Sequence, residues 1–155
     1  MIVSGTTNNL GQLFLYKSEN LIDFEFVGEL LNNHSPEDGY VKLKGGTFEV
    51  PDYINIDGKE ILISSPMRLK QEGNNYENLH SVVYMEGNMD FENGVYNYKD
   101  MHEIDSGFDF YAAQTAKLPD GRTIMLAWMQ MWDRTMPTAV DRWAGGYTLP
   151  RELSF

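Results

Sequence analysis

Residues 53–63 read YINIDGKEILI, and this stretch decides the fold of the chain. Apolar and polar side chains alternate before the pair Asp57-Gly58, and an apolar run rich in isoleucine follows it. Asp-Gly pairs tolerate the positive φ angles that a two-residue hairpin turn demands. The stretch therefore predicts two antiparallel strands joined by a tight turn.

The rest of the chain repeats this alternation of short strands and turns. Asn93-Gly94 and Asp120-Gly121 are two further pairs that favour two-residue turns. A single helical turn is expected around residues 18–22, and the longest irregular segment is 32–39. Short β-branched or aromatic runs predict strands at 12–16, 24–27, 60–63, 81–85 and 122–128. We expect an all-β structure of antiparallel hairpins, for which propeller blades, a sandwich and a barrel all stay open.

Composition limits the classes of function. A chain of 155 residues with 42% hydrophobic and 13% aromatic residues suffices for one modest domain with a real core. Its formal net charge of −11 disfavours nucleic acid and anionic membranes as partners. The absence of cysteine excludes disulfides, thiolate zinc sites and cysteine nucleophiles. No apolar run approaches the roughly 18–20 residues of a membrane span, and the first residues lack the features of a signal peptide, so we expect a cytoplasmic protein.

The candidate chemistry is carried by carboxylates among aromatic residues. The three histidines share no metal-ligand spacing, so neither a metal nor another cofactor is expected. Sugar chemistry suits the remaining pattern, because aromatic faces stack on sugars and acids cleave the glycosidic bond. Glu49 and Asp52 would point to opposite faces of an extended strand and so would not form a catalytic pair, and Pro51 should hold Val50 extended. Taken alone, this pattern is more typical of an ordinary glutamate at a strand edge.

Five motifs occur in order along the chain. FEVPD at 48–52 is similar to the pattern WECPD, and GFDFYAAQT at 107–115 is similar to GFDFYAPQT. The other three are LYKSENL with FEFVGEL at 15–30, WMQMW at 128–132, and WAG with LPREL at 143–153. Together they resemble glycoside hydrolase family 32, the group of bacterial sucrose-6-phosphate hydrolases, invertases and levanases. The chain departs from the family patterns at Phe48, Val50, Ala113 and Ala127, where Trp, Cys, Pro and Gly are usual.

The resemblance implies a five-bladed β-propeller with a funnel-shaped active site on its axis. It also implies a retaining mechanism that uses three acids, of which only the acid/base maps here, onto Glu49. The NDPNG motif of the nucleophilic Asp and the RDP motif of the stabilising Asp do not occur in the sequence. Residues 1–155 therefore resemble the middle blades of an incomplete propeller, without the N-terminal nucleophile region and the C-terminal β-sandwich. Tyr111 and Trp128 are candidates for lining the sugar pocket or for plain core packing, and Asp109 for a hydrogen bond in the funnel or a structural turn.

Two functions follow from these observations. The resemblance implies a parent protein that hydrolyses the β-fructofuranosyl bond of sucrose, sucrose 6-phosphate or a fructan, while the chain alone is inactive. The alternative is a non-enzymatic module that binds sugar or drives oligomerisation, or the product of a truncated gene. Exposed strand edges of an open propeller favour homo-oligomers. The sequence does not select the fructoside. Recognition of a 6-phosphate would need cations that converge on one pocket, and the sequence alone does not place Arg134, Arg142 and Arg151 in space.

Overall fold

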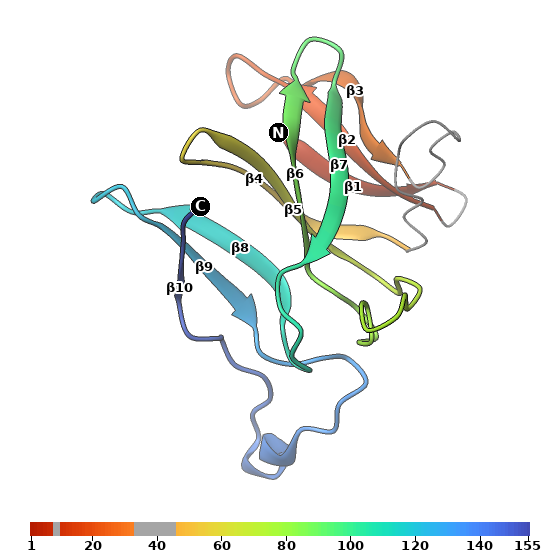
Figure 1. Ribbon diagram of the computed structural model, residues 1–155, viewed down its shortest axis with the longest axis vertical. Coiled ribbons are helices and arrows are strands. Elements are labelled where there is room, and N and C mark those ends of the chain that lie inside the picture. Colours follow the sequence, from red (N-terminus) through yellow and green to blue (C-terminus); the bar gives the residue numbers. More distant parts are fainter. Residues whose placement is uncertain (8–9, 33–45) are drawn as a thin grey trace.

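The computed structural model describes residues 1–7, 10–32 and 46–155, which form three antiparallel sheets (Figure 1). The first sheet has the order β1-β2-β3, the second β4-β5-β6-β7 and the third β10-β9-β8. The strands of the first two sheets are β1 (Ile2–Thr7), β2 (Leu10–Lys17), β3 (Glu25–Asn32), β4 (Phe48–Ile56), β5 (Lys59–Pro66), β6 (Val83–Asp90) and β7 (Val95–Glu103). The third sheet holds β8 (Tyr111–Lys117), β9 (Thr123–Trp128) and β10 (Arg151–Leu153), and the short 3-10 helix η1 (Pro137–Asp141) lies between β9 and β10.

The hairpin predicted at 53–63 is confirmed as β4 and β5. Ile56 pairs with Lys59, and the two residues between them have φ angles of 52° and 83°. The two-residue turns predicted at Asn93-Gly94 and Asp120-Gly121 are wrong in length, because residues 91–94 and 118–122 form the connections. In the first of these loops the Asp90 carboxylate accepts backbone N–H bonds from Glu92 and Asn93, which widens the turn.

Residues 18–22 form a turn held by side chains rather than a helical turn. The Ser18 hydroxyl accepts the backbone N–H of Leu21 at 2.9 Å, and Asn20 Oδ1 accepts those of Ile22 and Asp23 at 2.9 Å. Such side-chain bonds compete with the backbone bonds of a helix. Except for Asn32 at the end of β3, the predicted irregular segment 32–39 lies outside the described residues.

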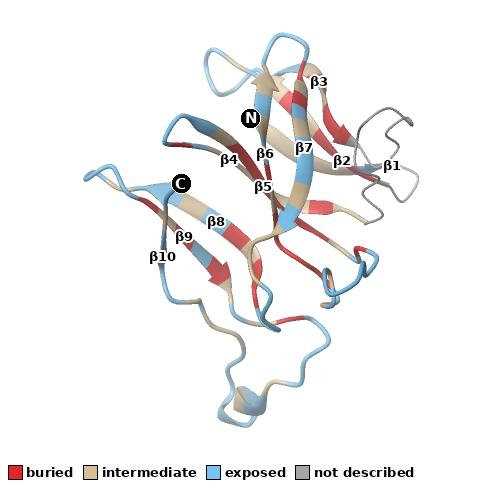
Figure 2. Cartoon of the chain, in the orientation of Figure 1, coloured by how far each residue is buried: buried red, intermediate tan, exposed pale blue. Residues whose placement is uncertain are grey.

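Strand β5 of the second sheet is buried over most of its length and on both faces (Figure 2). Leu62 of β5 packs with Leu13 and Phe48 in a core between the first and second sheets. Its neighbours Ile61 and Ile63 pack on the other face with Met125 of the third sheet. Because alternate side chains of β5 enter two different cores, the sequence 61–63 is apolar throughout. Stacking of sheets face to face is the arrangement expected of adjoining propeller blades.

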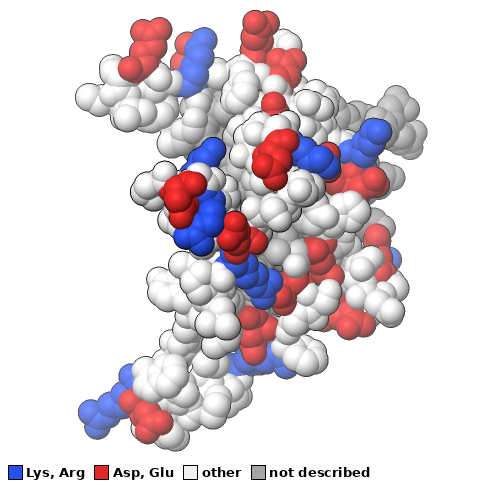
Figure 3. Space-filling model, turned by 60° about the vertical axis from the view of Figure 1, so that its left-hand side comes forward, with Lys and Arg blue, Asp and Glu red and all other residues white. Residues whose placement is uncertain are grey.

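The surface carries mixed charge. Acidic and basic side chains are interspersed on the face in Figure 3, and exposed pairs such as Lys59–Glu86, with Nζ 3.1 Å from the carboxylate, add little stability. Among the described residues, no helix is both long enough and apolar enough to cross a membrane.

Candidate active site

Strands β1, β4 and β8, the first strand of each sheet in chain order, meet at a cavity of about 550 Å³. Ser4 of β1 lies on one side of it, Glu49 of β4 and Tyr111 of β8 on the others. Its lining is completed by Thr47, Val50, Ala112, Trp128 and Trp132. Within the described part of the chain, Glu49 is the one carboxylate that lines this cavity. The motifs at 48–52 and 107–115, far apart in sequence, thus contribute to a single site.

A β-bulge in β4 determines where Glu49 points. Glu49 lies opposite Ser65 and Asp52 lies opposite Ile63, so three steps along β4 match two steps along β5. Val50 absorbs the extra residue with a φ angle of 50°. The expectation that Pro51 holds Val50 extended is therefore wrong. The extra residue requires a local turn of the backbone, and this requirement outweighs the usual effect of a following proline.

The bulge also reverses the expected orientation of the two acids. One additional residue restores the parity of the strand, so Glu49 and Asp52 both face the third sheet. Glu49 Oε2 accepts a hydrogen bond from the Tyr111 hydroxyl at 2.8 Å. Asp52 Oδ2 accepts bonds from the backbone N–H and the hydroxyl of Thr115, each at 2.7 Å. The prediction of opposite faces is wrong, but Asp52 does not line the cavity and is not a second acid there.

Tyr111 places its hydroxyl between two acceptors. The residue is 2% exposed, and its oxygen lies 2.8 Å from Glu49 Oε2 and 3.0 Å from the backbone carbonyl oxygen of Ser65. Burial raises the pKa of the Tyr111 hydroxyl, and contact with the Glu49 carboxylate raises that pKa further. The hydroxyl therefore stays protonated and has one hydrogen to donate. It can donate to an ionised Glu49, or accept from a protonated Glu49 while donating to Ser65.

His80 packs beside Tyr111 and is a residue whose position sequence reasoning missed. It is 3% exposed, and its ring centre lies 5.4 Å from that of Tyr111. Its Nδ1 atom accepts the backbone N–H of Arg68 at 3.2 Å, and burial lowers the pKa of His80, so the ring is held neutral. No group of three or more His, Asp or Glu side chains in the described ranges is arranged to hold a metal ion.

The other sequence candidates are not all brought to the cavity. Trp128 lines it and makes an edge-to-face contact with Trp132, with ring centres 5.2 Å apart. Trp132 is 64% exposed and belongs to the WMQMW motif, which could have pointed to it. Asp109 is exposed and does not line the cavity.

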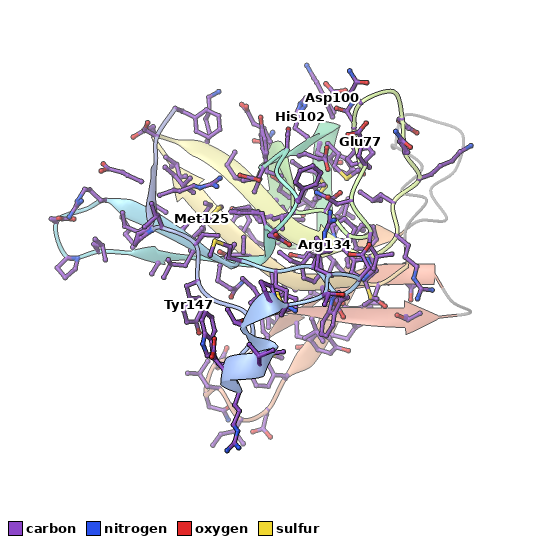
Figure 4. The ribbon with its side chains drawn as sticks, turned by 90° about the horizontal axis from the view of Figure 1, so that it is seen from below. Glu77, Asp100, His102, Met125, Arg134 and Tyr147 are labelled. Atoms are coloured by element: carbon purple, nitrogen blue, oxygen red, sulfur yellow. The ribbon has the colours of Figure 1, made fainter. Side chains whose placement is uncertain are left out.

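Two of the arginines considered for phosphate binding have other contacts. Arg151 bonds Asp105 at 2.6 Å, and Arg134 lies over the Phe108 ring at 5.0 Å. Arg134 and Tyr147 belong to the segment that carries η1 (Figure 4). Neither arginine lines the cavity, so the structure does not assign a phosphate pocket to them.

Comparisons with known proteins agree with this geometry. The sequence profile of the Glycosyl hydrolases family 32 N-terminal domain matches residues 1–155. The chain belongs to glycoside hydrolase family 32. Its similarity to the sucrose-6-phosphate hydrolase of Staphylococcus xylosus is 34% identity over 154 residues, covering 99% of the chain and 30% of that protein. The family 32 β-fructofuranosidase of Bombyx mori superposes with a TM-score of 0.86 at 34% identity, covering 99% of the chain and 32% of that structure.

A third comparison concerns the fold alone. The sucrose-6-phosphate hydrolase of Lactobacillus gasseri superposes with a TM-score of 0.85 at 23% identity, covering 99% of the chain and 31% of that structure. The predicted family and the all-β propeller class of this family 32 chain are thus confirmed. The number of blades stays a prediction. The chain spans about a third of the length of the curated relatives that it matches, at 30% and 32% for two of them.

Proposed function

We propose that this chain supplies the acid/base residue, Glu49, of a retaining β-fructofuranosidase. The observation that carries the proposal is the Glu49 carboxylate, the one acid among the described residues of a cavity that also holds a buried phenol and two tryptophans. A structure of the Bombyx mori relative contains sucrose, and the Staphylococcus xylosus relative is named for sucrose 6-phosphate. The substrate class is therefore a β-fructofuranoside such as sucrose, sucrose 6-phosphate or a fructan.

Glu49 would protonate the oxygen of the leaving group and then, once ionised, activate the water that releases fructose. The Tyr111 hydroxyl can hydrogen-bond the carboxyl group in both of these states, because it has one hydrogen and two acceptors within reach. The rings of Trp128 and Trp132 provide apolar surfaces for sugar faces. These steps need no metal or cofactor. Asp109, which is exposed, stays a prediction as a substrate contact.

The chain alone should be inactive. Retaining hydrolysis requires a second carboxylate about 5–5.5 Å from the first, on the other side of the scissile bond. Among the described residues that line the cavity there is no such group. We infer that residues 1–155 are middle blades, and that segments with the NDPNG and RDP motifs complete the site in a longer cytoplasmic protein. Below, "the complete enzyme" means a protein in which these 155 residues are joined to both aspartate motifs.

The alternative function is a non-enzymatic sugar-binding or oligomerising module. The presence of one carboxylate among the cavity's described lining residues favours this alternative for the chain in isolation. The two proposals differ in the reading frame upstream of the Met1 codon. An in-frame NDPNG and RDP pair supports the enzyme, and a stop codon immediately upstream supports the module or a truncated gene.

The biochemical test is fructose release from sucrose and sucrose 6-phosphate. The complete enzyme should release fructose, and its Glu49→Gln variant should lose several orders of magnitude in kcat, least for substrates with good leaving groups. The 155-residue chain should release none. Glu49-dependent turnover by the isolated chain would refute the division of the site between segments, and an inactive complete enzyme would refute the proposed function.

A further inference from the structure

The bulge at the acid/base residue has a counterpart in the neighbouring sheet. Tyr111 lies opposite Trp128 and Gln114 lies opposite Leu126, so three steps along β8 match two steps along β9. Strand β8 therefore also contains one extra residue. The φ angle of Ala112 is 52°, close to the 50° of Val50. The segments FEVPD at 48–52 and FYAAQ at 110–114 are therefore two copies of one backbone device, each placing its second residue at the cavity.

The two bulges hold each other reciprocally. From β4, the Asp52 carboxylate crosses to β8 and accepts both the backbone N–H and the hydroxyl of Thr115, each at 2.7 Å. From β8, the Gln114 amide crosses back and donates to the carbonyl oxygen of Val50 at 3.4 Å. The Tyr111–Glu49 bond precedes both links along β4 and along β8. We call the three side chains Asp52, Gln114 and Thr115 the clasp.

The clasp joins β4 to β8 next to a strained position of the backbone. A β-branched residue with positive φ is a genuine outlier, and such residues cost about 1–3 kcal/mol unless the surroundings over-determine them. Val50 is such a residue, with Glu49 directly before it and Asp52 two residues after it. If β4 were released from β8, relaxation of Val50 towards negative φ would rotate the Glu49 side chain away from Tyr111.

We propose that Asp52, through its two bonds to Thr115, is a positioning residue for Glu49. It fixes the position of β8 against β4 and thereby holds the acid/base carboxyl group on Tyr111. The inference rests on the proposed function, because it concerns the same acid. A displacement of about 1 Å at a reacting group costs on the order of 10²-fold in rate, so losing the clasp should slow the step that Glu49 performs.

The test compares Asp52→Ala with Glu103→Ala in the complete enzyme. Both Thr115 bonds end on one Asp52 oxygen, which the amide oxygen of Asn could replace, so alanine is needed to remove the acceptor. Glu103 is a matched control, because it also accepts one backbone N–H, from Tyr76 at 2.9 Å, and one hydroxyl, from Ser81 at 2.7 Å, without contacting Glu49. Asp52→Ala should lower kcat for sucrose by roughly 10- to 100-fold while KM stays within about twofold. Glu103→Ala should leave both parameters near those of the unmodified enzyme. Thr115→Val removes the hydroxyl but keeps the backbone N–H, so it should give a smaller loss of the same kind if Asp52→Ala folds poorly.

Two readouts separate positioning from general damage. For an aryl β-fructofuranoside, whose leaving group needs little protonation, the loss caused by Asp52→Ala should shrink. In the Glu49→Gln background, Asp52→Ala should lower the remaining rate by less than about twofold, because residues that act as a unit are not additive. Equal losses for both substrates, or a full loss in the Glu49→Gln background, would overturn the proposal. If the unmodified enzyme turns over and Asp52→Ala matches Glu103→Ala, the clasp is refuted while the proposed function stands.

Discussion

The bond between Tyr111 and Glu49 predicts an energetic coupling that can be measured in the 155-residue chain without any assay of activity. The Tyr111 hydroxyl donates to a carboxylate oxygen at 2.8 Å from a nearly fully buried position. A hydrogen bond to a charged group contributes about 1.5–3 kcal/mol, whereas a neutral one contributes about 0.5–1.5 kcal/mol. Glu49→Gln keeps an acceptor of the same shape but removes its charge. The coupling between Tyr111→Phe and Glu49→Gln should therefore be about 1–1.5 kcal/mol at pH 7.

The assay is urea unfolding of four proteins: the unmodified chain, the two single variants and the double variant. Tyr96→Phe is the matched control for the phenol. Tyr96 is fully buried, and its hydroxyl also lies near two acceptors, the backbone oxygens of Met85 at 2.8 Å and Glu60 at 3.0 Å. Tyr96→Phe should destabilise the chain, yet combine additively with Glu49→Gln to within about 0.5 kcal/mol. Additivity of Tyr111→Phe with Glu49→Gln would refute the geometry on which the acid/base assignment depends.

Three further predictions concern pH, packing and assembly. Burial raises the pKa of Tyr96 and of Tyr111 above the ordinary 10.0, so above about pH 10 these phenols ionise only in the unfolded chain. The free energy of unfolding should therefore fall as pH rises, with each tyrosine contributing about 1.4 kcal/mol per pH unit to the slope. In Tyr96→Phe and in Tyr111→Phe the slope should be smaller by that amount. A Cβ at Gly28 would lie 2.5 Å from the Asn93 carbonyl oxygen, so Gly28→Ala should cost about 1–3 kcal/mol in urea unfolding, whereas Gly46→Ala, whose Cβ would meet nothing closer than 3.6 Å, should change stability little. The strand edges of three open sheets should drive dimers or larger assemblies at tens of micromolar, and a monodisperse monomer in sedimentation would contradict this.

Local chemistry made part of the fold predictable. The Asp57-Gly58 turn needs only its own two residues to adopt positive φ, and the structure confirms it. At Asn93-Gly94 the same rule failed, because the Asp90 side chain, three residues before Asn93, accepts the backbone N–H groups of Glu92 and Asn93 and enlarges the loop. Turn length thus depended on a residue outside the dipeptide that signalled the turn.

The site was predictable only where a motif named it. Glu49 was identified from FEVPD, but the partner of its carboxyl group is Tyr111, which is 62 residues away in sequence. The place of His80 beside Tyr111 depends in turn on the packing of the second sheet against the third. Contacts of this kind are set by tertiary packing and leave no periodic signal in the strands that make them.

The bulge at Val50 shows why an error of one residue mattered here. Phe48 and Tyr53 both pack toward the first sheet, although they are five residues apart and would face opposite sides of a regular strand. Without the extra residue, keeping 52–54 in place would turn Phe48 out of its core and point Glu49 into it. Burying an unpaired carboxylate there would cost several kcal/mol. The alternation rule therefore fails where Phe48 must enter the apolar core and Glu49, the next residue, must reach the cavity and Tyr111. The extra residue at Val50, with its strained positive φ, allows both.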